Sequence, residues 1–97
     1  MIEITHKKGC IKVKGHAGYA EHGKDIVCAA ISTLTQTFIA SVGELTADNL
    51  KCDIAAGNAV IRYRDLTGEA QLLLNSFFIG CEMIAASYPE NVRLSKR

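Results

Sequence analysis

Two residues that could act together in nucleophilic chemistry lie near the start of the sequence. His16 and Cys28 belong to one Gly-rich segment, which reads GHAGYAEHGKDIVC over residues 15–28. A cysteine thiolate attacks carbonyl carbon, and a nearby histidine can take the thiol proton and later protonate a leaving amine. The pair therefore predicts nucleophilic catalysis by a thiolate if the fold brings the two side chains together.

The position of Cys28 supports this chemistry. Apolar residues recur at helical steps from Ile26 onward, and Asp25 is a good N-cap for a helix that starts there. Cys28 then lies in the first helical turn, where unpaired N–H groups and the positive end of the helix dipole favour a thiolate. Backbone amides at this helix start, including that of Cys28, are candidate oxyanion-hole donors. The negative charge of Asp25 partly opposes thiolate formation.

The choice of base lies between two histidines. His16 follows a predicted strand, and a strand end holds a side chain better than a loop tip does. His22 lies within the loop, and we interpret it as a substrate contact or a solvated side chain. A bland interpretation stays open beside this one, because a lone cysteine on an apolar helix is often a small buried hydrophobe. In that case Asp25 is only a cap and the glycines only make the loop mobile.

The elements that must position these residues follow from the apolar pattern. Alternation predicts a hairpin of strands 1–5 and 10–15, a second hairpin of strands 50–56 and 58–64 around Gly57-Asn58, and a last strand over 92–95. Helical spacing predicts one helix from residue 26 to between 43 and 47. A second helix is capped by Asp65 or Thr67 and ends before Pro89.

The expected fold is α+β. We expect a single domain over residues 1–97, a two-layer sandwich with a five-stranded, mostly antiparallel sheet and two helices in the order β-β-α-β-β-α-β. Phe77-Phe78-Ile79 supplies more apolar surface on the second helix than one sheet contact requires. This surplus predicts a homodimer.

Composition narrows the classes of function. The 97-residue chain is 48% hydrophobic with a net charge of +1, which argues against disorder and gives no reason to expect direct nucleic-acid binding. A non-catalytic ribosome- or RNA-associated module using the Lys-rich first hairpin is the alternative. The four cysteines show no metal-binding spacing, so no metal and no organic cofactor are expected. The absence of an uninterrupted membrane-length apolar run and of a signal-peptide layout predicts a cytoplasmic protein.

One segment resembles a known family. Gly15-His16-Ala17, followed by the run GKDIVCAAIS over residues 23–32, is similar to the signature of the bacterial ribosomal-processing cysteine proteases of the Prp family. The resemblance extends over the whole chain in length and element order. It implies that His16 and Cys28 form the catalytic pair and that Asp25 is an active-site residue, with Ser32 in the same signature.

The resemblance also implies a substrate and a mode of binding. Members of the family remove a short N-terminal extension from a large-subunit ribosomal protein, after an apolar stretch ending in aromatic residues, and related phage structural proteins can be cut. The resemblance further implies a homodimer and a mobile loop that orders over the bound peptide. On this basis residues 17–24 act as a lid, and the expected supporting or substrate-binding residues in it are Ala17, Gly18, Tyr19, His22 and Gly23.

Overall fold

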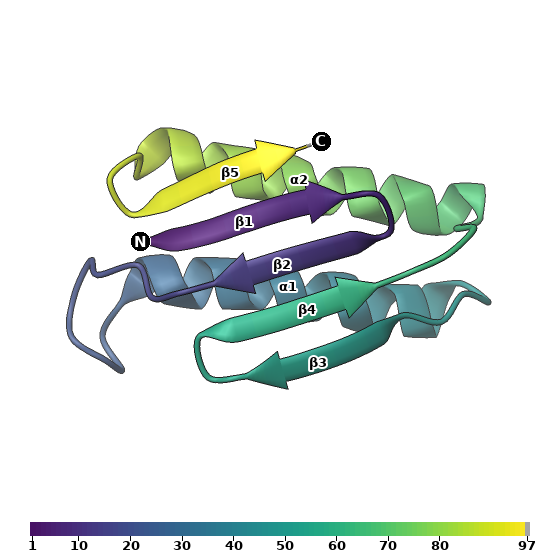
Figure 1. Ribbon diagram of the computed structural model, residues 1–97, viewed down its shortest axis with the longest axis horizontal. Helices are drawn as coiled ribbons and strands as arrows, with labels where there is room; N and C mark the ends of the chain where they lie inside the picture. The colour runs from purple at the N-terminus through teal and green to yellow at the C-terminus, as the bar shows by residue number, and fades with distance from the viewer. Residues whose placement is uncertain (97) are drawn as a thin grey trace.

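A five-stranded sheet forms one layer of the protein (Figure 1). The computed structural model describes residues 1–96, except the side chain of Lys96. The strands follow the spatial order β3-β4-β2-β1-β5, and their bounds are β1 Ile2–Lys7, β2 Cys10–Lys14, β3 Lys51–Ala55, β4 Asn58–Arg62 and β5 Val92–Lys96. The pairs β1–β2, β2–β4 and β3–β4 are antiparallel, whereas β1 and β5 are parallel. The expected mostly antiparallel sheet is confirmed.

Two helices form the second layer, on one face of the sheet (Figure 1). Helix α1 spans Ile26–Leu45 and helix α2 spans Gly68–Ser87. Each begins at a side-chain cap, since Asp25 accepts from the first-turn amides of α1 and Thr67 accepts from the amide of Ala70 in α2. Helix α2 ends just before Tyr88-Pro89, because a proline disfavours helical backbone at the residue that precedes it. The α+β two-layer arrangement predicted from the sequence is confirmed.

The core lies between the sheet and the helices. Ile4, Ile11 and Ile61 from the sheet pack with Val42 and Leu74 from the helices, and all five are buried. By length and composition alone, each helix could cross a membrane. In this fold both helices instead bury an apolar stripe against the sheet, as core helices do.

Two apolar side chains lie outside the core. Leu45 continues the helical spacing of the α1 stripe but is 69% exposed, because the helix ends there. Cys52 belongs to β3, in which every residue is exposed. Strand β3 lies at the sheet edge, where the helix layer leaves it uncovered. Cys81 is buried and Cys10 is half-buried.

Candidate active site

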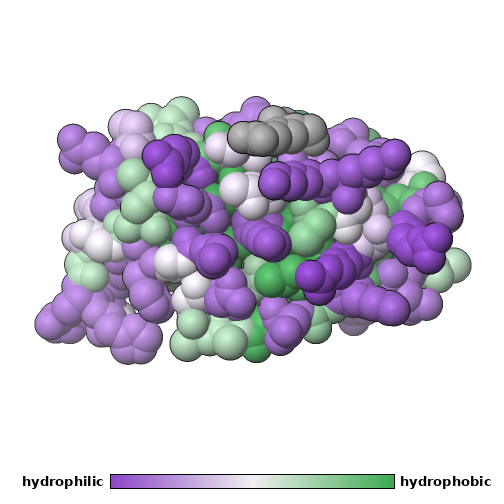
Figure 2. Space-filling view, viewed as in Figure 1, coloured by the Kyte–Doolittle hydropathy of each residue, from purple (hydrophilic) through white to green (hydrophobic). Residues whose placement is uncertain are grey.

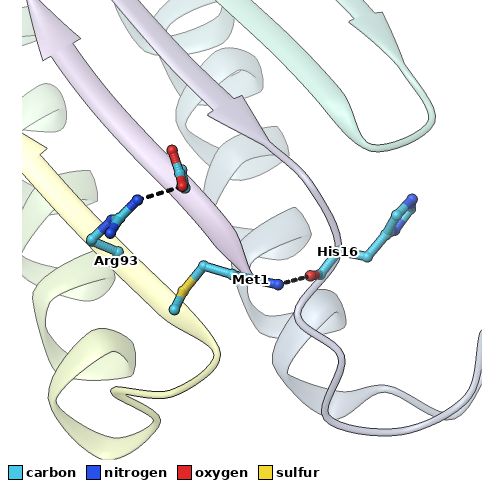
Figure 3. Close-up of polar contacts among 4 residues, drawn as sticks. Met1, His16 and Arg93 are labelled. Carbon is cyan, nitrogen blue, oxygen red and sulfur yellow. Dashed lines mark hydrogen bonds and ion pairs between the residues drawn. The ribbon is translucent and has the colours of Figure 1, made fainter.

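His16 is anchored through its backbone at the end of β2. The amide of Gly15 donates to the carbonyl of Gly57 at 2.8 Å, and the carbonyl of His16 accepts from the Met1 amino group at 2.6 Å. Figure 3 shows the imidazole pointing away from Met1. The ring lies against Gly57 in the β3–β4 turn, so closely that a Cβ on Gly57 would be 2.8 Å from Nε2. A side chain at this position would be strained by the φ of +71° and would displace the imidazole.

Cys28 lies in the first turn of α1, next to the start of the loop. The amide of Ala17 donates to its Sγ at 3.2 Å. Ala17 is itself fixed from the far end of the chain, because the Nδ2 amide of Asn91 donates to its carbonyl at 2.9 Å. The chain therefore returns from the strand end to Cys28, as the sequence predicted, and a backbone N–H is directed at the sulfur.

His16 and Cys28 both line one cavity of about 580 Å³. This volume falls in the range of small-molecule and peptide-residue sites in proteins. Within the described part of the chain, no hydrogen bond joins the His16 imidazole to Cys28. The expected pair thus shares a cavity but is not hydrogen-bonded in this structure.

Asp25 binds more of the backbone than a cap requires. Oδ1 accepts from the amides of Val27 at 3.0 Å and Cys28 at 2.9 Å, and Oδ2 accepts from the amides of Tyr19 at 3.0 Å and Ala20 at 3.2 Å. The hydrogen bond from the Cys28 amide is the largest cause that holds the pKa of Asp25 below its ordinary value of 3.8. Asp25 therefore ties the loop to the helix start.

This arrangement corrects one expectation about the oxyanion hole. The amide of Cys28 was a candidate donor, but it donates to Asp25 at 2.9 Å and does not point into the cavity as an unpaired group. The amide of Ala17, at 3.2 Å from Sγ, is the N–H that stands beside the sulfur. Because the Cys28 amide donates to the capping carboxylate of Asp25, it is not free to stabilise an oxyanion.

The other predicted site residues divide into two groups. Gly18, His22, Gly23 and Ser32 line the cavity together with His16 and Cys28. Ala17 and Tyr19 do not line it: Ala17 is buried and contributes its backbone, and the Tyr19 ring meets Tyr88 edge-on with centroids 5.4 Å apart. Tyr19 therefore holds the loop against the end of α2 in this conformation.

Sequence reasoning missed several residues of the site. Asn91 was not a candidate because only the parallel pairing of β1 with β5 brings it beside Ala17. The second hairpin was expected only as scaffold, yet it forms one wall of the cavity through Ile54, Ala55, Ala56, Gly57, Asn58 and Ala59. Ile54 of this wall is 55% exposed, which its place in the apolar alternation of strand 50–56 did not indicate.

Replacing Asp25 with alanine is expected to release the loop. The amides of Tyr19 and Ala20 lose their acceptor, so their hydrogen exchange should accelerate about tenfold, as measured by NMR or mass spectrometry. Because the pKa of Asp25 is lowered on folding, its anchoring persists in the wild type at all pH values above about 4 and is lost only in stronger acid. Glu21→Gln, in the same loop, is the matched control. Unchanged exchange in Asp25→Ala would refute the anchoring role.

Comparison with known proteins decides the family. The family model described as cysteine protease Prp matches residues 1–93. The chain belongs to the Prp family of cysteine proteases. It is 34% identical to the ribosomal processing cysteine protease Prp of Staphylococcus aureus (strain Mu50) over 84 residues, covering 84% of this chain and 79% of that protein. With the protein of the same name from Bacillus subtilis (strain 168), the identity is 27% over 103 residues, covering 97% and 92%.

A solved Prp structure has the same fold. The crystal structure of the S. aureus protease Prp with a covalently linked product peptide matches with a TM-score of 0.90 and 29% identity, covering 99% of this chain and 97% of that one. The resemblance inferred from residues 15–32 is thereby confirmed, and so is the enzyme class, a hydrolase of peptide bonds. Membership of a protease family argues against the non-catalytic alternative.

Proposed function

We propose that Cys28 is the nucleophile and His16 the general base of a protease that removes an N-terminal extension from a ribosomal protein precursor. The observation that carries this proposal is the shared cavity, which holds both side chains, and the Ala17 amide placed 3.2 Å from Cys28 Sγ. Family membership supports the reaction class.

The chemical steps need no other reacting group. His16 takes the Cys28 proton as Sγ attacks the scissile carbonyl carbon, and the Ala17 amide turns from the sulfur to the developing oxyanion. His16 then gives its proton to the leaving amine, which leaves a thioester on Cys28. Water loses a proton to His16, attacks the thioester, and releases the new carboxyl end while Cys28 regains its thiol. The His16 imidazole must rotate from Gly57 toward Cys28 when the peptide binds, which fits the looser geometry of unliganded sites.

The cavity wall suits an apolar peptide segment. The cavity is lined by Ile31 and Thr35 of α1, by Ile54 and Ala59 of the second hairpin, and by Gly18 and Gly23 of the loop. These two glycines have φ values of +69° and +87° and nothing within 4 Å of a Cβ position, so they let the loop bend in open space. Apolar or aromatic side chains that precede the cleaved bond would lie in this channel.

The names of the relatives support the proposed substrate class. Those from S. aureus and B. subtilis are named ribosomal processing cysteine proteases, and the matched crystal structure holds a covalently linked product peptide. We place the reaction in the cytoplasm, where ribosomal proteins are made. Phage structural proteins are the second class of substrate, and the same channel would accept them.

Peptide cleavage tests this function directly. A synthetic leader that ends in paired aromatic residues, joined to a charged segment, should be cut after the aromatic residues, and mass spectrometry of both products locates the bond. A matched leader with alanine in place of the aromatics is the control. Equal cleavage of the two leaders would contradict the specificity, and no cleavage of either would contradict the proposed substrate class.

We also propose that a second copy of the chain covers the outer face of α2. Of Phe77, Phe78 and Ile79, only Ile79 is exposed, so the surplus predicted there is narrower than expected. It continues along one helical face, however, through Leu72 at 69%, Ile79 at 59% and Met83 at 65% exposure. Light scattering should give twice the chain mass of 10.5 kDa for the wild type and the single mass for Ile79→Glu. A single mass for the wild type would refute the dimer.

A further inference from the structure

The outer face of the sheet carries a concentration of positive charge. Residues directly opposite in neighbouring strands share a face, and the register places Lys12 beside Val60, Lys14 beside Glu3 and Asn58, and Lys51 beside Arg62. Six exposed cations lie on this face, namely Lys7, Lys12, Lys14, Lys51, Arg62 and Arg93. We call them the basic sheet face. Figure 2 shows this side of the molecule as largely hydrophilic.

The near-neutral total charge conceals this segregation. Two carboxylates, Glu3 and Asp53, lie on the same face of the sheet as the six cations. The net charge of this face is therefore +4. Since the whole chain carries +1, the rest of the sequence carries −3. Neither helix contains a lysine or arginine, and their only charged residues are Glu44, Glu69 and Glu82. The molecule therefore has a positive sheet side and a negative helix side.

The cations on this face are available to a partner. Within the described residues, Arg93 is the only one of the six in an ion pair, with Glu3. Alternate residues of a strand are about 6.7 Å apart and neighbouring strands about 4.8 Å apart. Lys12, Lys14 and Arg62 thus lie within roughly one Debye length at physiological salt, about 8 Å, of a neighbouring cation, so their fields add.

We propose that the basic sheet face binds the phosphate backbone of RNA. Protein interfaces are usually centred on buried aromatic or large apolar anchors and are poor in lysine. This face is rich in lysine, carries no aromatic ring, and offers only Val60 as a sizeable apolar side chain. A dense polyanion needs no such anchor, and backbone contacts without stacking make the binding independent of sequence.

The choice of RNA over DNA rests on the proposed ribosomal function. The inference that the face binds a polyanion rests on its charge alone. Lys14 directly precedes Gly15-His16, so the basic sheet face reaches the active-site loop. RNA bound on this face would hold the enzyme beside a precursor that is itself associated with RNA. The total charge of the chain gave no reason to expect nucleic-acid binding. This proposal reverses that expectation.

Fluorescence anisotropy with a labelled 20-nucleotide RNA of mixed sequence tests the proposal. The full chain should bind, and log K should fall with log salt at a slope of about −0.7 per phosphate contact. The double variant Lys12→Gln/Arg62→Gln should bind roughly 25-fold more weakly at 0.1 M salt, with a slope smaller by about 1.4, if each residue contacts one phosphate. Asn49→Asp/Asn75→Asp, which lowers the net charge equally at exposed sites off this face, should bind like the wild type.

Several outcomes would overturn the proposal. These are no binding at 50 mM salt, equal losses in the two double variants, or tighter binding of poly-glutamate than of RNA at equal charge concentration. Tighter binding of duplex DNA than of RNA would also contradict it. Cleavage of the leader peptide is measured in parallel and should not change in Lys12→Gln/Arg62→Gln. Failure of wild-type cleavage would refute the proposed function and leave the binding result to stand or fall separately.

Discussion

Replacing Cys28 with serine is expected to lower kcat/KM for leader cleavage by at least about 10³-fold. The hydroxyl keeps the shape of the side chain but is a far weaker nucleophile than a thiolate, so the loss falls on the chemical step. The fold should persist, because Cys28 is only partly buried and its sulfur accepts one backbone hydrogen bond that a serine oxygen can also accept. Peptide kinetics and a thermal melt measure the two effects.

The matched control for Cys28→Ser is Cys52→Ser. Cys52 is exposed on β3 and does not line the cavity, so its replacement should leave cleavage within about twofold of the wild type. If Cys28→Ser kept full activity, the nucleophile would have to be sought elsewhere. If it unfolded, Cys28→Ala with its own melt would separate lost folding from lost chemistry.

Replacing His16 with alanine is expected to lower kcat by about 10²- to 10⁴-fold, the range for loss of a general base. The effect should appear in kcat more than in KM, since the imidazole acts on the proton of Cys28 rather than on substrate affinity. His22 lies in the loop and lines the same cavity. We expect His22→Ala to cost about tenfold or less, mainly in KM, because its role is contact with the peptide.

The pair of histidine variants distinguishes the two assignments. Activity that survives His16→Ala but not His22→Ala would make His22 the base. An added exogenous imidazole gives a further readout, since small bases can restore proton transfer in a cavity vacated by a histidine ring. Rescue is expected for His16→Ala and not for His22→Ala.

Local pattern was sufficient to predict the elements of the fold. The change from alternating to helical spacing at Ile26, the cap at Asp25 and the glycine at position 57 are all signals carried by neighbouring residues. The turn was predicted one residue late, because Ala55 pairs with Asn58 and the two turn residues are Ala56 and Gly57. The parallel pairing of β1 with β5 was not predicted, because it depends on how α2 returns the chain across the sheet. Asn91 was missed for that reason, as its contact with Ala17 joins residues 74 positions apart.

The site was predictable only in part. The return of the loop to Cys28 could be inferred from strand, loop and helix order, whereas the direction of the His16 ring could not. It depends on Gly57, a turn residue of another hairpin, whose missing Cβ leaves room for the imidazole. The hydrogen bonds from the Tyr19 and Ala20 amides to Asp25 could not be predicted either. The direction of the loop backbone is set by glycines with positive φ and not by an apolar pattern.

The basic sheet face shows a similar limit of composition. A net charge of +1 is compatible with charges mixed evenly over the surface. It is equally compatible with opposite charges on the two layers of the fold. Only the strand register, which sorts alternate residues to opposite faces, separates the cations of β2 and β4 from the core.

Thiol alkylation with peptide mapping tests the central claim, that Cys28 carries the reaction, most directly. Of the four cysteines, Cys81 is buried, and desolvation by neighbouring groups raises the pKa of the Cys52 thiol even though the residue is exposed, which lowers its reactivity near neutral pH. Iodoacetamide should place one label on Cys28 with the same time course as the loss of peptide cleavage, and bound leader peptide should slow both. Full cleavage activity in protein whose Cys28 is completely labelled would contradict the account.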